Sequence, residues 1–296
     1  MSNPRIPFRL STERPRLPAP GGRPLMVHVV VNVEHWPFEN PMPRQMLTAP
    51  HGMQPRPDVA NFSWAEYGMR CGMPRLVELF DRHKIPVSAT VNASVIDTYP
   101  SLAAMMREAG WEFMGHGYIQ RSLQQEKDER QVIHASLERL ARFTGRAVRG
   151  WLGPGLHETA ETPELLKEAG IDYVCDWVLD DLPCWMTTAR GPLIAMPYAL
   201  ELNDAVMYAI EKQGSDEILR RVIDTVSTFE TELARNPRVL TLALHPYAIA
   251  VPHRLPHLAH AIALLKARPD TQFLNGSAIA DWYVSVEPPS VAAGAA

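Results

Sequence analysis

The sequence predicts an α/β fold, a closed or nearly closed (β/α) barrel of about seven or eight mostly parallel strands. Short apolar runs alternate with amphipathic stretches between residues 25 and 285, the order of a parallel sheet with right-handed crossovers. The first run, residues 25–32, is almost continuously apolar and rich in valine, which is typical of a strand buried on both faces. The chain lacks GxGxxG and GxxxxGK segments, so the nucleotide-binding open sheets lose support.

Eight short apolar segments are expected to form strands. They are residues 25–32, 87–91, 111–114, 148–151, 173–175, 193–195, 239–244 and 272–274. Two amphipathic stretches, residues 131–143 and 218–233, place their apolar side chains on one face at helical spacing. Another helix is expected to begin at Thr162 and end at Gly170, directly before a strand.

The two ends of the chain differ in composition from the middle. Residues 1–24 are rich in proline, arginine and glycine, and are predicted to form an extended arm over the surface or at a subunit contact. Residues 25–285 are expected to be a single barrel domain, and residues 286–296 a flexible tail. The arm favours a homo-oligomer.

The composition argues against several classes of protein. The net charge of −4, from 29 basic and 33 acidic residues, gives no electrostatic reason to expect nucleic acid. No apolar run has the length of a membrane span, and the N-terminus lacks the hydrophobic segment of a signal peptide, so we expect a cytoplasmic protein without a membrane partner. The three cysteines, Cys71, Cys175 and Cys184, form no CxxC pair and are expected to be reduced thiols.

Polar and ionisable residues accompany five of the predicted strands. They occur in residues 32–36, 115–120, 149–154, 176–183 and 244–246. Functional groups of parallel α/β proteins gather where strands end, so these segments are expected to share one barrel mouth. Each has a structural explanation as well: a lone histidine is often structural, Asp180 and Asp181 could form a turn, and Arg149 could be an ion-pair partner. Their occurrence together in a regular order favours a site.

Taken in their order along the chain, these five segments resemble the five motifs of the polysaccharide-deacetylase (carbohydrate esterase 4) superfamily. The resemblance covers roughly residues 25 to 282 and implies a distorted (β/α) barrel. It also implies paired acidic residues in the first motif, two metal-binding histidines four apart in the second, and an arginine that orients the base in the third. The fourth motif then supplies an aspartate and a tryptophan, and the fifth a general-acid histidine.

The chain departs from the metal-binding pattern of that superfamily at two places. Asn32-Val33-Glu34 stands where the family has two aspartates, and Gln120 stands where it has the second histidine. A zinc site usually needs three protein ligands and an open position, but here only Glu34, His116 and the poor ligand Gln120 are left. We therefore expect no cofactor and, at most, weak binding of a divalent metal such as zinc.

Other segments resemble one branch of the superfamily, the metal-independent allantoinases and related cyclic-amide hydrolases. Residues 66–72, Glu-Tyr-Gly-Met-Arg-Cys-Gly, carry the first resemblance, and residues 180–185 and 197–204 carry the others. A glycine-bounded turn that packs a helix would also explain residues 66–72. The residues expected to bind a small-molecule substrate or to form the wall of its pocket are Trp36, Glu66, Tyr67, Arg70, Tyr118, Trp151, Pro154, Trp177, Trp185 and Asn203.

Hydrolysis of an amide requires a positioned water, a base, stabilisation of the oxyanion, and an acid for the leaving nitrogen. We expect Glu34 to be the base, held in place by Arg149 or His116. His245 is expected to protonate the nitrogen, with Asp180 or Asp181 setting its tautomer. Two alternatives stay open at this stage. One is a metal-dependent deacetylase of N-acetyl sugars, and the other is an inactive barrel that serves as a binding protein.

Overall fold

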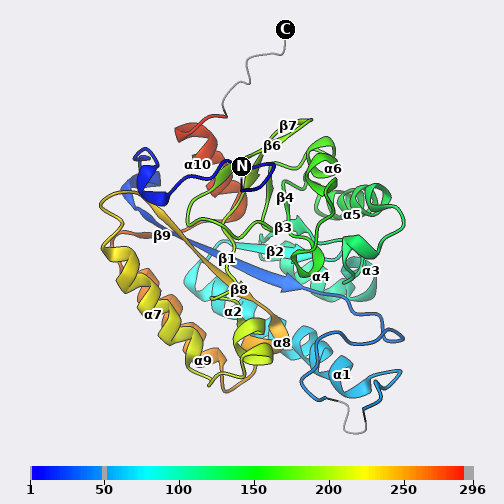
Figure 1. Ribbon diagram of the computed structural model, residues 1–296. Helices are drawn as coiled ribbons and strands as arrows, with labels where there is room; N and C mark the ends of the chain where they lie inside the picture. The colour runs from blue at the N-terminus through cyan, green and yellow to red at the C-terminus, as the bar shows by residue number, and fades with distance from the viewer. Residues whose placement is uncertain (1, 49–51, 290–296) are drawn as a thin grey trace.

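A computed structural model describes residues 2–48 and 52–289 of the chain (Figure 1). Its centre is one curled, mostly parallel sheet with the strand order β6-β7-β5-β4-β3-β2-β1-β8, in which β9 also pairs with β1. The only antiparallel pair among the described strands is β6 with β7. The predicted deacetylase-type α/β barrel is confirmed, as a half-barrel whose end strands β6 and β8 do not pair.

Most strands lie where the apolar runs predict them, and the hairpin β6–β7 adds a strand that was not predicted. The strands are β1 (Leu25–Val33), β2 (Val87–Val91), β3 (Glu112–Gly115), β4 (Gly150–Trp151), β5 (Tyr173–Val174), β6 (Cys184–Thr188), β7 (Gly191–Ala195), β8 (Arg238–Leu244) and β9 (Thr271–Phe273).

Helices follow most of the strands, and most of them pack on the outer face of the sheet, whereas the last helix, Gly276–Val286, packs in the same apolar cluster as Met26 and Val30 (Figure 1). They are α1 (Val59–Tyr67), α2 (Met73–His83), α3 (Val95–Thr98), α4 (Pro100–Glu108), α5 (Glu129–Thr144), α6 (Thr162–Glu168), α7 (Glu217–Glu230), α8 (Pro246–Ile249), α9 (Leu255–Ala267) and α10 (Gly276–Val286). A π-helical turn, Gly68–Gly72, joins α1 to α2, and a second one covers Val206–Ile210. No helix within residues 2–48 and 52–289 is both long and apolar enough to cross a membrane.

The central strand β1 separates two apolar layers. Its side chains alternate between the faces of the sheet, as the period of two in a strand requires. Val27, Val29 and Val31 pack with the helices, whereas Met26 and Val30 belong to the barrel interior. The same alternation carries on beyond the last strand residue, so that Glu34 also points into the interior at the carboxyl end of β1.

The N-terminal segment lies along the barrel near β6 and α10. It contains two short 3₁₀ turns and is otherwise without helix or strand. Leu17 is buried, the indole of Trp282 donates to the Pro18 carbonyl, and Arg14 pairs with Asp180 and Glu287. The predicted tail, 286–296, falls largely on residues 290–296, which lie outside the described part of the chain.

Candidate active site

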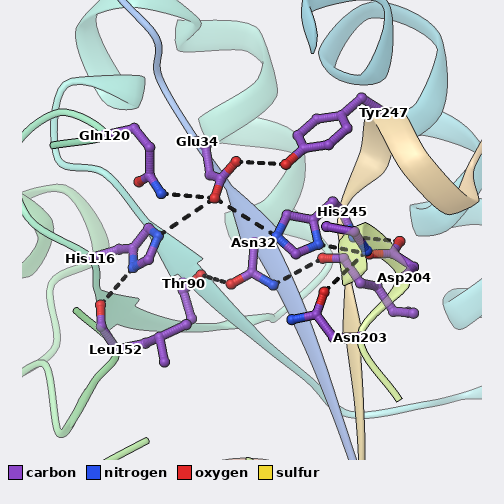
Figure 2. Close-up of polar contacts among 12 residues, drawn as sticks. Asn32, Glu34, Thr90, His116, Gln120, Leu152, Asn203, Asp204, His245 and Tyr247 are labelled. Carbon is purple, nitrogen blue, oxygen red and sulfur yellow. Dashed lines mark hydrogen bonds and ion pairs between the residues drawn. The ribbon is translucent and has the colours of Figure 1, made fainter. Parts of the chain in front are cut away.

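Three buried ionisable side chains meet at the carboxyl ends of β1, β3 and β8 (Figure 2). His116 Nε2 lies 3.9 Å, and His245 Nε2 3.7 Å, from the same oxygen of Glu34, Oε1. Each of the three residues is at most 4% exposed. The sequence-based expectation that strand ends bring these residues together at one mouth therefore agrees with their geometry.

Two neutral donors hold the Glu34 carboxylate. Gln120 Nε2 donates to Oε1 at 2.8 Å, and the Tyr247 hydroxyl donates to Oε2 at 2.9 Å. Burial alone would raise the pKa of Glu34, but the neighbouring His116, His245 and Arg44 side chains together lower it to about 2. Glu34 is therefore a carboxylate at any physiological pH. Burial and the charge of Glu34 also raise the pKa of Tyr247, which keeps that hydroxyl a donor.

Asp204 fixes the ring of His245. One oxygen of its fully buried carboxylate lies 2.7 Å from His245 Nδ1, and the other accepts the His245 backbone N–H at 2.7 Å. Asn203 begins the turn that carries Asp204, because its side-chain oxygen accepts the N–H groups of Ala205 and Val206. Asn203, which we expected to bind substrate, thus positions Asp204. With Nδ1–H directed at Asp204, Nε2 of a neutral His245 presents its lone pair toward Glu34.

The predicted role of Asp180 or Asp181 beside His245 is wrong. Asp180 pairs with Arg14 of the N-terminal segment at 3.0 Å, and Asp181 lies 3.7 Å from Arg238. The carbonyl of Asp181 accepts the N–H of Val239, near the start of β8. These two aspartates are therefore at the opposite end of the strand from His245.

The predicted role of Arg149 is also wrong. Arg149 precedes β4, so it lies at the amino end of the strands, away from Glu34. Its guanidinium pairs with Asp172 and Asp281, each at 2.6 Å. These carboxylates raise its pKa further, and the arrangement is a structural ion-pair cluster.

Glycines allow His116 to lie deep in the mouth. Its Nδ1 lies 2.6 Å from the Leu152 carbonyl, and its Nε2 has no hydrogen-bond partner among the described residues. A Cβ on Gly115 would come within 2.4 Å of the Trp151 ring, so the close approach of that fully buried ring requires glycine. Gly117 adopts φ +69° and packs on Pro154. Trp151 and Pro154, both predicted to contact substrate, are buried supports under His116.

Asn32 stands in the first motif but takes part in a network that uses its whole amide. Its oxygen accepts the Thr90 hydroxyl at 2.8 Å, and its nitrogen donates to the Leu244 carbonyl at 3.2 Å and to the Tyr198 hydroxyl at 3.0 Å. Asn32 therefore ties β1 to β2 and β8 beneath the site.

The segment Glu66–Gly72 packs against the backbone that follows His245. A Cβ on Gly68 would lie 2.4 Å from the Tyr247 nitrogen, and one on Gly72 would lie 2.5 Å from the Pro246 oxygen. Only glycine permits this contact with the chain that follows His245. The glycines of this segment are thus explained by close packing, as the alternative of a glycine-bounded turn that packs a helix predicted.

The residues of this segment that we expected to bind substrate have other contacts. Glu66 and Arg70 pair with each other at 2.8 Å and line a separate groove of about 510 Å³, and the Tyr67 hydroxyl accepts a hydrogen bond from Arg75.

The remaining aromatic residues predicted to line the pocket have different surroundings. Trp185 donates to the Glu287 carbonyl and packs on Tyr283, so its assignment to the pocket wall is wrong. The Trp177 indole donates to Glu158 at 2.9 Å. Trp36 packs partly against the core next to Glu34, and Tyr118 is 39% exposed beside His116.

Sequence reasoning missed Tyr247, Asp204, Tyr198 and Arg44. Asp204 and Tyr198 lie inside a segment noted only for its resemblance, 197–204, and Tyr247 is two residues beyond His245. Arg44 lies in the long connection between β1 and α1, where no periodicity marks a functional residue.

The donors at this mouth do not fit a zinc ion. Gln120 turns its NH₂ group toward Glu34, and both oxygens of that carboxylate already accept hydrogen bonds. Among the described side chains, no three His, Cys, Asp or Glu residues are arranged to hold a metal ion, whereas a catalytic zinc site usually needs three protein ligands. No step proposed below therefore involves a metal.

Comparison with known proteins finds a family that this chain resembles. A model of the polysaccharide deacetylases matches residues 63–174. A crystal structure of a probable polysaccharide deacetylase from Pseudomonas aeruginosa PAO1 is 25% identical, with a TM-score of 0.84 over 94% of this chain and 97% of that one. The chain therefore resembles the polysaccharide deacetylases in sequence over these residues and in fold over most of its length. The resemblance predicted from five motif segments is thereby confirmed.

Two further proteins are similar to this chain. The crystal structure of Puue allantoinase is 26% identical, with a TM-score of 0.83 over 94% of this chain and 96% of that one. A peptidoglycan deacetylase from Helicobacter pylori is 26% identical over 156 residues, 52% of this chain and 53% of that protein. The chain spans between 53% and 62% of the curated relatives that it matches.

Proposed function

We propose that this polysaccharide-deacetylase relative hydrolyses the C–N bond of a small cyclic amide, imide, hydantoin or ureide. One observation carries the proposal: the Nε2 atoms of His116 and His245 lie 3.9 and 3.7 Å from one oxygen of Glu34. These separations are too long for direct hydrogen bonds, and a water or substrate atom that lies to one side of the three groups can contact them together. The similarity to Puue allantoinase supports a cyclic ureide as the substrate.

In this mechanism His245 moves the proton. Its Nε2 lone pair takes a proton from the attacking water while Asp204 stabilises the imidazolium through Nδ1–H. The new C–O bond converts the carbonyl oxygen to an oxyanion. When the C–N bond breaks, the oxyanion electrons re-form the C=O bond and His245 gives its proton to the leaving nitrogen. The acyl carbon becomes a carboxylic acid, which loses its remaining proton to solvent and is then a carboxylate.

The lowered pKa of Glu34 changes the role that we assigned to it from the sequence. A carboxylate with a pKa of about 2 accepts protons weakly, since an efficient general base has a pKa near the working pH. In the proposed reaction Glu34 therefore orients the water and stabilises the charged His245. Tyr247 and Gln120 hold the carboxylate in position for this.

The chemistry favours an activated amide. With acid–base and electrostatic groups alone, a strained or doubly acylated ring nitrogen is a better leaving group than the nitrogen of an ordinary acetamide. A hydantoin, imide or cyclic ureide meets this requirement, and ring opening produces a single molecule with a free carboxylate.

The test is a hydrolysis panel with purified protein of measured metal content. Allantoin, hydantoin, succinimide and N-acetylglucosamine oligomers are each assayed before and after dialysis against a chelator. We expect ring opening of at least one cyclic substrate at a rate that chelation leaves unchanged. Failure on every cyclic substrate would refute the proposal and favour a barrel that only binds its ligand.

A metal-dependent deacetylase of N-acetyl sugars is the second candidate. The unpartnered Nε2 of His116 and the Glu34 carboxylate beside it supply two of the three protein ligands that a catalytic zinc site usually needs. The similarity to the Helicobacter pylori peptidoglycan deacetylase points the same way. Deacetylation that is lost on chelation and restored by zinc would establish this candidate in place of the first.

A further inference from the structure

Arg44 carries a buried hydrogen-bond donor without a partner. It lies between β1 and α1, and its Nη1 atom is buried with no acceptor among the described residues. None of the ion pairs found within residues 2–48 and 52–289 involves Arg44. Burying a polar donor without an acceptor is costly, and a bound water, an ion or a ligand usually completes such a group.

The groups that act on Arg44 are those of the active site. Burial opposes its charge, but the Glu34 and Asp204 carboxylates and the Tyr247 and Tyr198 hydroxyls favour it and hold its pKa above the usual value. Arg44 in turn helps to lower the pKa of Glu34. The guanidinium is thus a permanent cation within electrostatic reach of the Glu34 carboxylate.

The chain around Arg44 is anchored on both sides. Before it, the side chain of Met42 is 2% exposed. After it, the backbone N–H groups of Met46 and Leu47 donate to Asn61 at 2.8 and 3.0 Å, and Asn61 is held by Asp58 at the start of α1. A donor held in this way needs little reorganisation when a ligand arrives, which is what stabilises a developing charge most effectively.

We propose that Arg44 binds the substrate oxygen that becomes negatively charged during C–N hydrolysis and then the carboxylate of the product. This inference rests on the proposed function and narrows it. As water adds to the carbonyl carbon, the C=O π electrons move to the oxygen, and Arg44 Nη1–H stabilises that oxyanion. When the C–N bond breaks and the nitrogen takes its proton from His245, the same oxygen becomes part of a carboxylic acid, which loses its proton to solvent and becomes a carboxylate. The product class is therefore a ring-opened acid such as a ureido acid.

Binding of a ureido acid tests this role without requiring turnover. N-Carbamoylglycine, the acid formed by opening hydantoin, and its uncharged amide are titrated calorimetrically into wild-type protein, Arg44→Met, Arg44→Lys and the control Arg142→Met. Arg142 pairs with Glu138 on the surface of α5 and is matched in charge. We expect Arg44→Met to weaken binding of the acid by about 10- to 100-fold, the scale of a charge-assisted hydrogen bond, and to leave binding of the amide unchanged.

Each outcome decides for or against the role. Intermediate binding of the acid by Arg44→Lys, with no effect of Arg142→Met, supports it. If the wild type does not bind the acid, or Arg44→Met weakens acid and amide equally, Arg44 is not an anion site. If binding of the acid depends on Arg44 but the protein hydrolyses none of the cyclic substrates, the anion site is supported and the proposed function is refuted. In an active enzyme, partial rescue of Arg44→Ala by guanidinium ions, without rescue by ammonium ions, would support direct contact with the reacting oxygen.

Discussion

His245 Nδ1 and Asp204 Oδ1 lie 2.7 Å apart, and both side chains are almost completely buried. This pair decides which nitrogen of the imidazole faces Glu34, and so which nitrogen exchanges a proton with water and substrate. The residues are 41 positions apart in the chain and meet because the turn after Asn203 lies beside the end of β8.

Asp204→Asn should lower kcat by at least ~10²-fold with a smaller effect on KM. The asparagine amide can donate to Nδ1 and thereby favour the wrong tautomer of His245. Steady-state kinetics on the cyclic substrate found in the hydrolysis panel measure this. Asp181→Asn, which changes a carboxylate at the other end of β8, should retain the wild-type rate. Equal rates for both variants and the wild type would remove Asp204 from the mechanism.

Glu34→Gln should also lower kcat by at least ~10²-fold, because the neutral amide cannot stabilise the charged His245. Tyr247→Phe removes one donor to the carboxylate and should cost less, about 10-fold. The two variants are compared by kcat at saturating substrate. A Glu34→Gln enzyme with near-wild-type turnover would contradict the proposed site.

Gly68→Ala should destabilise the protein and impair catalysis, although Gly68 contacts no substrate in the proposed mechanism. The added Cβ would meet the Tyr247 backbone nitrogen at 2.4 Å, an overpacking expected to cost ~1–3 kcal/mol of unfolding free energy. Glu66→Gln breaks only the exposed ion pair with Arg70 and should leave the stability unchanged, because solvent screens such a pair. Thermal unfolding and kinetics of both variants separate packing from substrate binding. A strong rise in KM for Glu66→Gln would restore the substrate-binding hypothesis for this segment.

His28 should make the protein less stable as the pH falls. It lies fully buried on β1, 3.0 Å from the Ser88 hydroxyl, and burial lowers its pKa to about 3. In the unfolded chain His28 has its ordinary pKa of about 6.5, whereas in the folded protein its pKa is about 3. Between these two pH values only the unfolded chain binds a proton at His28, so acidification through this range lowers the stability that the protein has at higher pH. The wild-type protein should lose unfolding free energy when the pH is lowered from 7.5 to 5.0. His28→Met should lose up to ~2 kcal/mol less than the wild type over the same interval. Urea unfolding at both pH values measures it, with the exposed His134→Gln expected to behave as wild type.

Asp176→Asn should stabilise the protein at neutral and alkaline pH. Burial and the charge of Glu158 raise the pKa of Asp176, and the pKa of Glu158 is raised as well. A carboxyl group whose pKa is raised on folding keeps its proton after the unfolded chain has lost it, so stability falls as the pH rises through that range. An amide at position 176 can donate to Glu158 at every pH. We expect a melting temperature about 2–4 °C higher at pH 8, the shift for ~1 kcal/mol, and a smaller gain at pH 4. A gain that did not grow with pH would show that the two carboxyls share no proton.

Much of the fold and the centre of the site could be predicted from local patterns. The valine-rich run of β1 and the apolar run of β8 each alternate between two faces, so Glu34 and His245 follow their strands on the interior side. The short strands gave less information. β4 has two residues, too few for any periodicity, and the arginine before it was taken for a residue of the mouth although it precedes the strand.

The sequence by itself determined the alternation of strands and helices, the order of the motif segments, and the presence of Glu34, His116 and His245 at strand ends. These features depend on side-chain period and chain direction, which neighbouring residues encode. Only the tertiary structure decided the partners: Asp204 for His245, Tyr247 and Gln120 for Glu34, and Arg44 within electrostatic reach of the site. Those partners come from loops and turns, and their positions depend on how separate elements pack and on which buried polar groups need hydrogen bonds, which no local pattern records.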